Sequence, residues 1–192
     1  MRLTGRTAGD RGRRDADLRE GIGYLDAALR LAPDNWTAWW VRGKAQQALE
    51  HHEAAYESLR RAYGINGGHV EVGREFVAEC LETGRAAEGV RVAEALSIRE
   101  PRNGGLLANL AVAYLINGRL DDANRAADAA LRLDGADAIT VSVKRRIEDV
   151  RAGTMAATLA TSGPIKAGLE RAEVNNHVVP KSVAVFQAAS RG

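Results

Sequence analysis

The stretch NLAVAYLINGRLDDANRAADAALRLDGAD, residues 109–137, decides the fold of this chain. Its apolar residues recur at steps of three and four, which is the spacing that places side chains on one face of an α-helix. Asn117-Gly118 interrupts the pattern, and both residues tolerate the left-handed conformation that ends helices. Asp134-Gly135 ends the second run in the same way. The stretch therefore predicts two short helices joined by a tight turn.

The same pattern recurs along the chain with a period of 34 residues. Rows that start at Trp36, Val70 and Gly104 align small residues in shared columns, and a partial row precedes them. A column of small residues indicates that neighbouring helices cross closely there, because a larger side chain would hold them apart. The clearest columns are Gly43/Val77/Ala111, Glu50/Gly84/Gly118, Ala55/Gly89/Ala123, Leu59/Ala93/Ala127 and Ala62/Leu96/Ala130.

These rows resemble the tetratricopeptide repeat (TPR) family. The third row carries the family's succession of leucine, small residue, tyrosine, glycine, alanine and alanine-leucine, and the first row contributes Trp39 and Gly43 in the matching positions. The second row diverges more, since Ala95-Leu96 comes one residue early and Cys80 replaces the usual tyrosine. The resemblance covers about residues 18–136. It implies an all-α, right-handed α-solenoid of about three helix-turn-helix units with flanking and capping helices.

We expect three segments along the chain. Residues 1–14, rich in arginine, are expected to form a flexible basic arm. Residues 15–152 are expected to form the solenoid, including an N-terminal helix from Asp15 to Leu31. Residues 153–192 are expected to form a tail, with a short helix followed by an extended apolar segment. In that segment Val183, Val185 and Phe186 are candidates for docking in a groove, because they are unusually apolar for a solvated tail.

The helix after the third row is expected to cap the solenoid and to begin at Asp137. Its two faces differ, as a terminal helix requires. The inward stripe is Ile139, Val143, Ile147 and Val150, and the solvated side is Lys144, Arg145, Arg146, Glu148 and Asp149.

The amino-acid composition limits the classes of protein and partner that the sequence allows. Hydrophobic residues make up 45% and charged residues 27%, which is typical of a soluble globular chain, and the net charge of +2 is too small to predict a polyanionic partner. The single cysteine, Cys80, excludes an internal disulfide framework and is expected to pack in the core. We find no secretory signal and no stretch that could span a bilayer, so we expect a cytoplasmic protein without a membrane partner.

No motif predicts catalysis, a cofactor or a metal. His51 and His52 are adjacent and point in different directions, which is poor geometry for metal binding, and His69 and His177 are isolated. The glycine-rich turn at residues 64–68 lacks the lysine-serine pair of a phosphate-binding loop. We therefore predict that the chain is not an enzyme and needs no cofactor.

The tryptophans Trp36, Trp39 and Trp40 are the most informative local feature. Trp39 is expected in the core, whereas Trp40 is expected to face the concave side, where members of the TPR family bind peptides. An aromatic anchor beside cations predicts an acidic or amphipathic ligand segment. By the resemblance, the groove residues are Trp40, Lys44, Gln47, Arg74, Asn109 and Val112.

The sequence thus predicts a non-catalytic scaffold or adaptor that binds a peptide or a partner protein, with the tail as a possible route to homo-oligomers. Two alternatives stay open. One is a nucleic-acid-associated regulator that uses the arginines of the arm, and the other is an accessory subunit of an enzyme complex. The arm lacks interleaved aromatic residues, so nucleic acid is not the expected partner. The arginines concerned are Arg2, Arg6, Arg11, Arg13 and Arg14.

Overall fold

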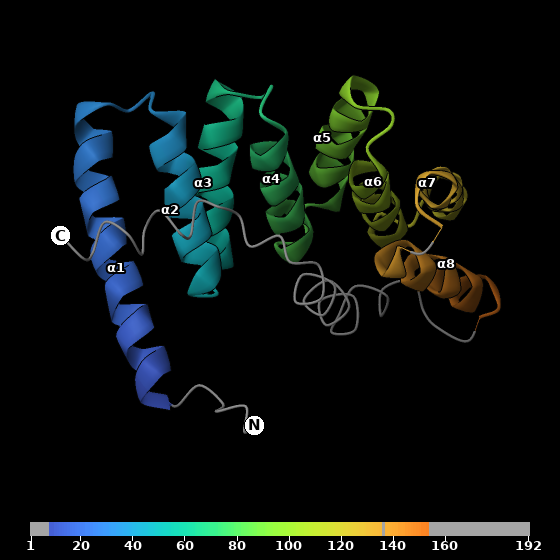
Figure 1. Cartoon of the computed structure of the whole chain (residues 1–192), viewed down its shortest axis with the longest axis horizontal. Coiled ribbons are helices and arrows are strands. Elements are labelled where there is room, and N and C mark those ends of the chain that lie inside the picture. Colours follow the sequence, from blue (N-terminus) through green and yellow to red (C-terminus); the bar gives the residue numbers. More distant parts are fainter. Residues whose placement is uncertain (1–7, 136, 154–192) are drawn as a thin grey trace. The chain divides into compact units, whose positions relative to one another are not determined.

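The computed structural model of the chain describes residues 8–135 and 137–153 (Figure 1). This part of the chain is helical apart from short turns, and none of it forms a β-strand. No helix in it is long and apolar enough to span a bilayer. The helices are α1 (Ala8–Leu31), α2 (Trp36–Ala48), α3 (His52–Ile65), α4 (Val70–Glu82), α5 (Ala86–Arg99), α6 (Gly104–Ile116), α7 (Leu120–Leu133) and α8 (Ala138–Arg151).

The chain divides between Glu100 and Pro101 into two compact units. The first contains α1 to α5, and each of these helices packs on the next one along the chain. The second contains α6 to α8, in which α8 packs on both α6 and α7. The prediction of an all-α chain built from helix-turn-helix pairs is confirmed.

One polar residue caps the first helix of every repeat. The side chains of Asn35, His69, Asn103 and Asp137 each accept a hydrogen bond from the backbone N–H three residues later, at 3.1, 3.4, 3.2 and 2.7 Å respectively. Such a side chain satisfies a backbone donor that the helix itself leaves unpaired. The four residues lie 34 positions apart, as do the starts of α2, α4, α6 and α8. α8 begins after Asp137 as predicted, and it is the first helix of a fourth repeat.

The turn inside each repeat places one residue in the left-handed conformation. Glu50, Gly84 and Gly118 occupy the same column and have φ angles of 59°, 75° and 76°. Glycine adopts this conformation freely, whereas a residue with a Cβ atom loses about 1–2 kcal/mol there. The predicted helix break at Asn117-Gly118 is confirmed, and Glu50 makes the same turn under strain.

The columns of small residues mark where paired helices meet. Five columns were named above, and every residue in them is buried except those of the turn column Glu50/Gly84/Gly118. A Cβ atom on Gly43 would lie 2.7 Å from Cγ of Leu59, and one on Gly73 would lie 2.8 Å from Cδ1 of Leu96. Both distances are shorter than van der Waals contact, so each glycine accommodates a leucine of the second helix. Where the Gly73 column holds a large residue, the Leu96 column holds alanine: Trp39 with Ala62, and Leu107 with Ala130.

Helix α1 begins at Ala8 instead of Asp15, so the prediction of a flexible arm is wrong for residues 8–14, while residues 1–7 lie outside the described part. Acidic and basic residues lie four positions apart here, as in Asp10 and Arg14, and this spacing stabilises a helix. Extending a helix also costs less free energy than starting one. The added turns project beyond α2 (Figure 1).

Helix α8 has the predicted inward stripe, with Val143 2% and Ile147 0% exposed. Arg146 was expected on the solvated side, but it is only 8% exposed. It lies at the margin of the stripe, three residues after Val143, and the aliphatic stem of an arginine packs readily on apolar surface. Arg145 and Glu148 are exposed as predicted.

Candidate functional site

Three rings gather where α2 and α4 begin in the first unit. The ring centroids of Trp36 and Trp40 lie 6.2 Å apart in a stacked arrangement, and the His69 ring lies 4.9 Å from Trp36 and 5.3 Å from Trp40. All three side chains are half-buried. His69 was predicted to be isolated, which is wrong. The sequence did contain a signal for its position. His69 shares a column with the capping residue Asn35, which predicts that it lies at the start of α4.

Trp40 carries a hydrogen-bond donor that no described residue satisfies. Its indole Nε1 is shielded from solvent and has no partner there. Leaving such a donor unpaired costs about 1–3 kcal/mol. Trp39 was expected in the core, but it is only half-buried. Its Nε1 donates to the carbonyl of Pro33 at 2.8 Å, and its ring lies 5.6 Å from the guanidinium of Arg42.

The two cations expected in the groove are already paired with carboxylates. Lys44 Nζ donates to Glu75 Oε1 at 2.5 Å, across from α2 to α4. Arg74 pairs with Glu71 of its own helix at 3.1 Å, and both of these side chains are exposed. An exposed pair of this kind contributes less than about 1 kcal/mol, so Arg74 can exchange partners readily. The charge on this face therefore does not favour an acidic ligand.

A buried carboxylate completes the face. The side chain of Glu79 is 3% exposed, and it accepts a hydrogen bond from Gln47 Nε2 at 3.0 Å. His52 Nδ1 lies 3.2 Å from the other carboxylate oxygen, so His52 is not the simple solvated histidine that the sequence predicted. Burial raises the pKa of Glu79, although Gln47 and His52 counteract the rise. The four-residue spacing of Glu71, Glu75 and Glu79 on α4 was visible in the sequence but was missed.

We name this face of the first unit the α2–α4 surface. It consists of an aromatic end, an ion pair and a buried carboxylate, and it is assembled entirely from the first helices of two successive repeats. Its residues are Trp36, Trp40, Lys44 and Gln47 from α2, with His69, Glu71, Arg74, Glu75 and Glu79 at the start of α4 and along it.

The remaining groove candidates lie in the second unit. Asn109 is half-buried on α6, and Val112 on the same helix is only 3% exposed. A side chain buried to that degree offers almost no surface to a ligand, so Val112 is a core residue. The candidate docking residues Val183, Val185 and Phe186 lie outside the described residues.

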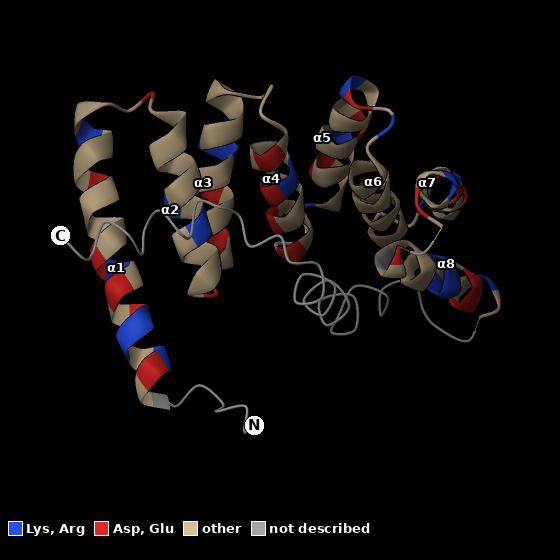
Figure 2. Cartoon of the chain, viewed as in Figure 1, with Lys and Arg blue, Asp and Glu red and all other residues tan. Residues whose placement is uncertain are grey.

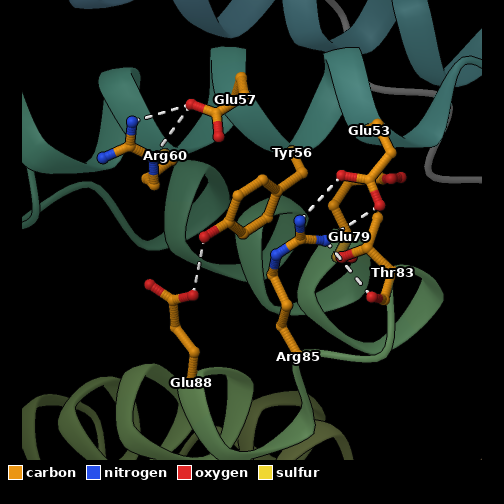
Figure 3. A network of polar contacts seen from close by, with 8 residues as sticks. All are labelled: Glu53, Tyr56, Glu57, Arg60, Glu79, Thr83, Arg85 and Glu88. Atoms are coloured by element: carbon orange, nitrogen blue, oxygen red, sulfur yellow. Dashed lines mark hydrogen bonds and ion pairs between the residues drawn. The ribbon is translucent and has the colours of Figure 1, made fainter.

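A second polar network connects α3 with α5 (Figure 3). Tyr56 donates to Glu88 at 2.8 Å, and Arg85 pairs with Glu53 at 2.9 Å while its guanidinium lies 4.1 Å from the centre of the Tyr56 ring. Burial, followed by the bond to Glu88, raises the pKa of Tyr56 to about 12. The network joins successive second helices, and we assign it a structural role.

The described residues offer little for catalysis or metal binding. Cys80 is fully buried, as predicted, and burial raises the pKa of its thiol to about 12. A thiol in that state is a poor nucleophile. Within residues 8–135 and 137–153, no three His, Cys, Asp or Glu side chains form a group that could hold a metal ion.

Comparison of the whole fold with solved structures places the chain among helical repeat proteins. MamA is 15% identical, with 89% of this chain and 98% of MamA covered and a TM-score of 0.65. YrrB, described as a TPR protein with an unusual peptide-binding site, is 12% identical over 90% of this chain and 84% of its own, with a TM-score of 0.64. A tetratricopeptide repeat protein from Parabacteroides merdae is 17% identical over 81% of this chain and 62% of its own, also with a TM-score of 0.64.

The chain has the TPR fold. No protein-family model matches its sequence, and no curated protein does. Within the TPR fold the three helix pairs are α2/α3, α4/α5 and α6/α7, while α1 is a lone second helix and α8 a lone first helix. The α2–α4 surface is thus built from the first helices of the first two TPR units.

Proposed function

We propose that this chain is a non-catalytic protein-interaction scaffold that binds a peptide or an exposed segment of a partner protein on the α2–α4 surface. The observation that carries the proposal is the unpaired, solvent-shielded indole N–H of Trp40 within an aromatic cluster. A bound segment that brings a backbone carbonyl to this nitrogen would remove the free-energy cost of the unpaired donor. The peptide-binding site of YrrB, a protein of the same fold, supports the same class of function.

The ion pairs on the α2–α4 surface favour a different kind of ligand from the one that the sequence predicted. Lys44 and Arg74 are matched by Glu75 and Glu71, so a purely acidic segment would have to break these pairs. An apolar segment would instead cover the rings of Trp36 and Trp40, whose large rigid surfaces are favoured anchors at interfaces. We therefore propose a ligand that is mainly apolar and presents a backbone acceptor.

The alternative in which a basic arm contacts nucleic acid gains no support from α1. This helix carries as many acidic as basic residues, and the two kinds are interspersed along it (Figure 2). A positive stripe, which phosphate contacts require, is not formed by the described residues of α1. The accessory-subunit alternative is compatible with the scaffold proposal, since the activity would then belong to the partner.

A matched pair of tryptophan variants tests the proposal. Peptides would be selected from a random phage-displayed library on the immobilised full chain, and their Kd measured by calorimetry with Trp40→Phe and Trp39→Phe. Both changes keep an aromatic ring and remove an indole N–H, but only the Trp39 N–H already has a partner. We expect Trp40→Phe to weaken binding about threefold to tenfold, the equivalent of one hydrogen bond, and Trp39→Phe to leave it unchanged.

Circular dichroism of both variants would confirm that the helices remain folded. Equal affinities for the two variants, or a library that yields no binder for the full chain, would show that the α2–α4 surface is not the binding site.

A further inference from the structure

The aromatic end of the α2–α4 surface, formed by Trp36, Trp40 and His69, carries two hydrogen-bond donors that the fold does not use. The first is the indole Nε1–H of Trp40, which has no partner among the described residues. The second follows from the cap of α4. His69 Nδ1 accepts from the backbone N–H of Val72 at 3.4 Å, which assigns the proton of the neutral ring to Nε2. No residue in the described part of the chain accepts from that Nε2–H.

The side chains at this end offer no acceptor to a ligand. An indole ring has none, and the one acceptor nitrogen of His69 is occupied by the cap. A ligand N–H that turned toward these rings would therefore stay unpaired, and an unpaired buried donor weakens binding. The matching ligand combines apolar surface and carbonyl oxygens with a backbone that lacks N–H groups. Proline is the residue with these properties.

We infer that the partner's segment is rich in proline and binds here in the polyproline II conformation; this rests on the proposed function of the α2–α4 surface and names its ligand class. A polyproline II helix has no internal hydrogen bonds, so its carbonyls remain free to accept. It is also formed before binding, so it loses less conformational entropy than a flexible segment does. Its pyrrolidine rings pack on Trp36 and Trp40, and its carbonyls accept from Trp40 Nε1 and His69 Nε2.

The size of the aromatic end sets how much of the ligand it holds. The three ring centroids lie between 4.9 and 6.2 Å apart. One turn of a polyproline II helix contains three residues and advances about 9 Å. The rings therefore cover about one turn of the ligand. The Lys44 cation farther along α2 is already paired with Glu75, so the ligand needs no charge of its own to match it.

Two synthetic peptides test the ligand class by calorimetry on the full chain. Both are acetylated and amidated, and both consist of four identical residues between two Ser-Gly-Ser segments. The four residues are proline in one peptide and valine in the control, which is similarly apolar but keeps its N–H groups. We expect the proline peptide to bind at least about tenfold more tightly than the valine peptide. Equal affinities, or no binding of the proline peptide up to about 1 mM, would overturn the assignment of a proline-rich ligand.

Three variants test whether the proline peptide occupies the aromatic end. His69→Asn removes the ring and its Nε2–H but keeps a capping side chain, because Asn35 and Asn103 cap the equivalent helices. Trp40→Phe removes the other donor. Trp39→Phe is the matched control, since the Trp39 N–H already has a partner.

The first two changes should each weaken binding of the proline peptide about threefold to tenfold, and the control should leave it unchanged. Circular dichroism would confirm that all three variants remain folded. An unchanged affinity in either His69→Asn or Trp40→Phe would overturn the assignment of the ligand to this end of the surface.

The library-selected peptides separate the ligand class from the proposed function. If they lose affinity in Trp40→Phe but contain no proline, and the proline peptide does not bind, the proline-rich ligand is refuted and the binding function stands. Selected peptides that bind Trp40→Phe and Trp39→Phe equally would instead refute the proposed function, and the ligand class with it.

Discussion

Replacing Gly73 with alanine should have opposite effects on stability in two backgrounds. In the natural chain the new Cβ atom would lie 2.8 and 2.9 Å from the two methyl carbons of Leu96. Leu96 is 1% exposed, so its side chain can shift only within the core, and overpacking of this kind costs about 1–3 kcal/mol. Alanine also gains about 1 kcal/mol over glycine inside a helix. The net expectation is a loss of about 1 kcal/mol from the free energy of unfolding.

When Leu96 is also alanine, the clash disappears. Leu96→Ala alone should cost about 2–5 kcal/mol, because it leaves a cavity between α4 and α5. Gly73→Ala then fills part of that cavity and keeps its gain in helix propensity, so it should stabilise this background by about 1 kcal/mol. The coupling between the two positions is therefore about 2 kcal/mol.

The assay is urea unfolding of the four chains of this double-mutant cycle, followed by tryptophan fluorescence, which reports on the first unit alone because every tryptophan lies in α2. Gly23→Ala is the matched control, since a Cβ atom there meets nothing within 4 Å. It should stabilise both backgrounds equally. If Gly73→Ala changes the stability by the same amount and sign with and without Leu96, the proposed size matching between α4 and α5 is refuted.

Four further outcomes follow from single residues. Urea unfolding should show that Glu50→Gly stabilises the chain by about 0.5–1 kcal/mol, because it removes a left-handed residue that has a Cβ atom. Gly84→Ala should destabilise the chain by about 1 kcal/mol. Its new Cβ atom would contact nothing, so the loss would come from the φ angle alone. Because burial raises the pKa of Glu79 above its usual 4.5, the folded state holds this proton more tightly, so its contribution to stability falls as the pH rises from 4.5 through the raised pKa. Glu79→Gln should remove that fall from a plot of unfolding midpoint against pH, and an unchanged plot would contradict the assignment. The buried Cys80 thiol should react with Ellman's reagent at mildly alkaline pH only as fast as the chain unfolds, so urea should accelerate a reaction that is otherwise very slow.

The helices and turns were predictable because their signals are local and repeat. Asn103 and Asp137 cap the helices that follow them, and Gly118 takes the left-handed turn that the sequence indicated. Because the pattern repeats every 34 residues, a capping or turn residue that is weak evidence in one row is supported by the same position in the other rows. Comparison with the other rows also explains the second row. There the column that holds alanine in the other two rows holds Leu96, and Gly73 leaves room for its side chain.

The partners of the surface side chains were less accessible to sequence reasoning. Periodicity indicates which face of α2 carries Lys44 and Gln47, but it does not show what lies opposite. Their partners Glu75 and Glu79 are 31 and 32 residues away, which is close to one repeat of 34 residues but not equal to it. The prediction of an acidic or amphipathic ligand counted the cations without these carboxylates, and it stays a prediction.

At both ends of the described repeats, a cation that forms an ion pair stands where the inner repeats have a buried apolar residue. Arg42 pairs with Asp26 at 2.7 Å between α1 and α2, and Lys144 pairs with Asp128 at 2.8 Å between α7 and α8. These pairs occupy the same two columns three repeats apart, and in the repeats between them the cation's column holds the buried residues Phe76 and Leu110.

Partly exposed ion pairs of this kind add little stability, so a gain in stability does not explain why charged residues replace apolar ones here. A terminal helix keeps one side in contact with water, and there a charge remains hydrated while its partner fixes the helix position. The same positions filled with phenylalanine or leucine would leave an apolar face on which another molecule could continue the array. We therefore interpret the two ion pairs as features that keep charge and water at α1 and α8, the outermost helices of the described part, and Arg145 and Glu148 are likewise exposed on α8.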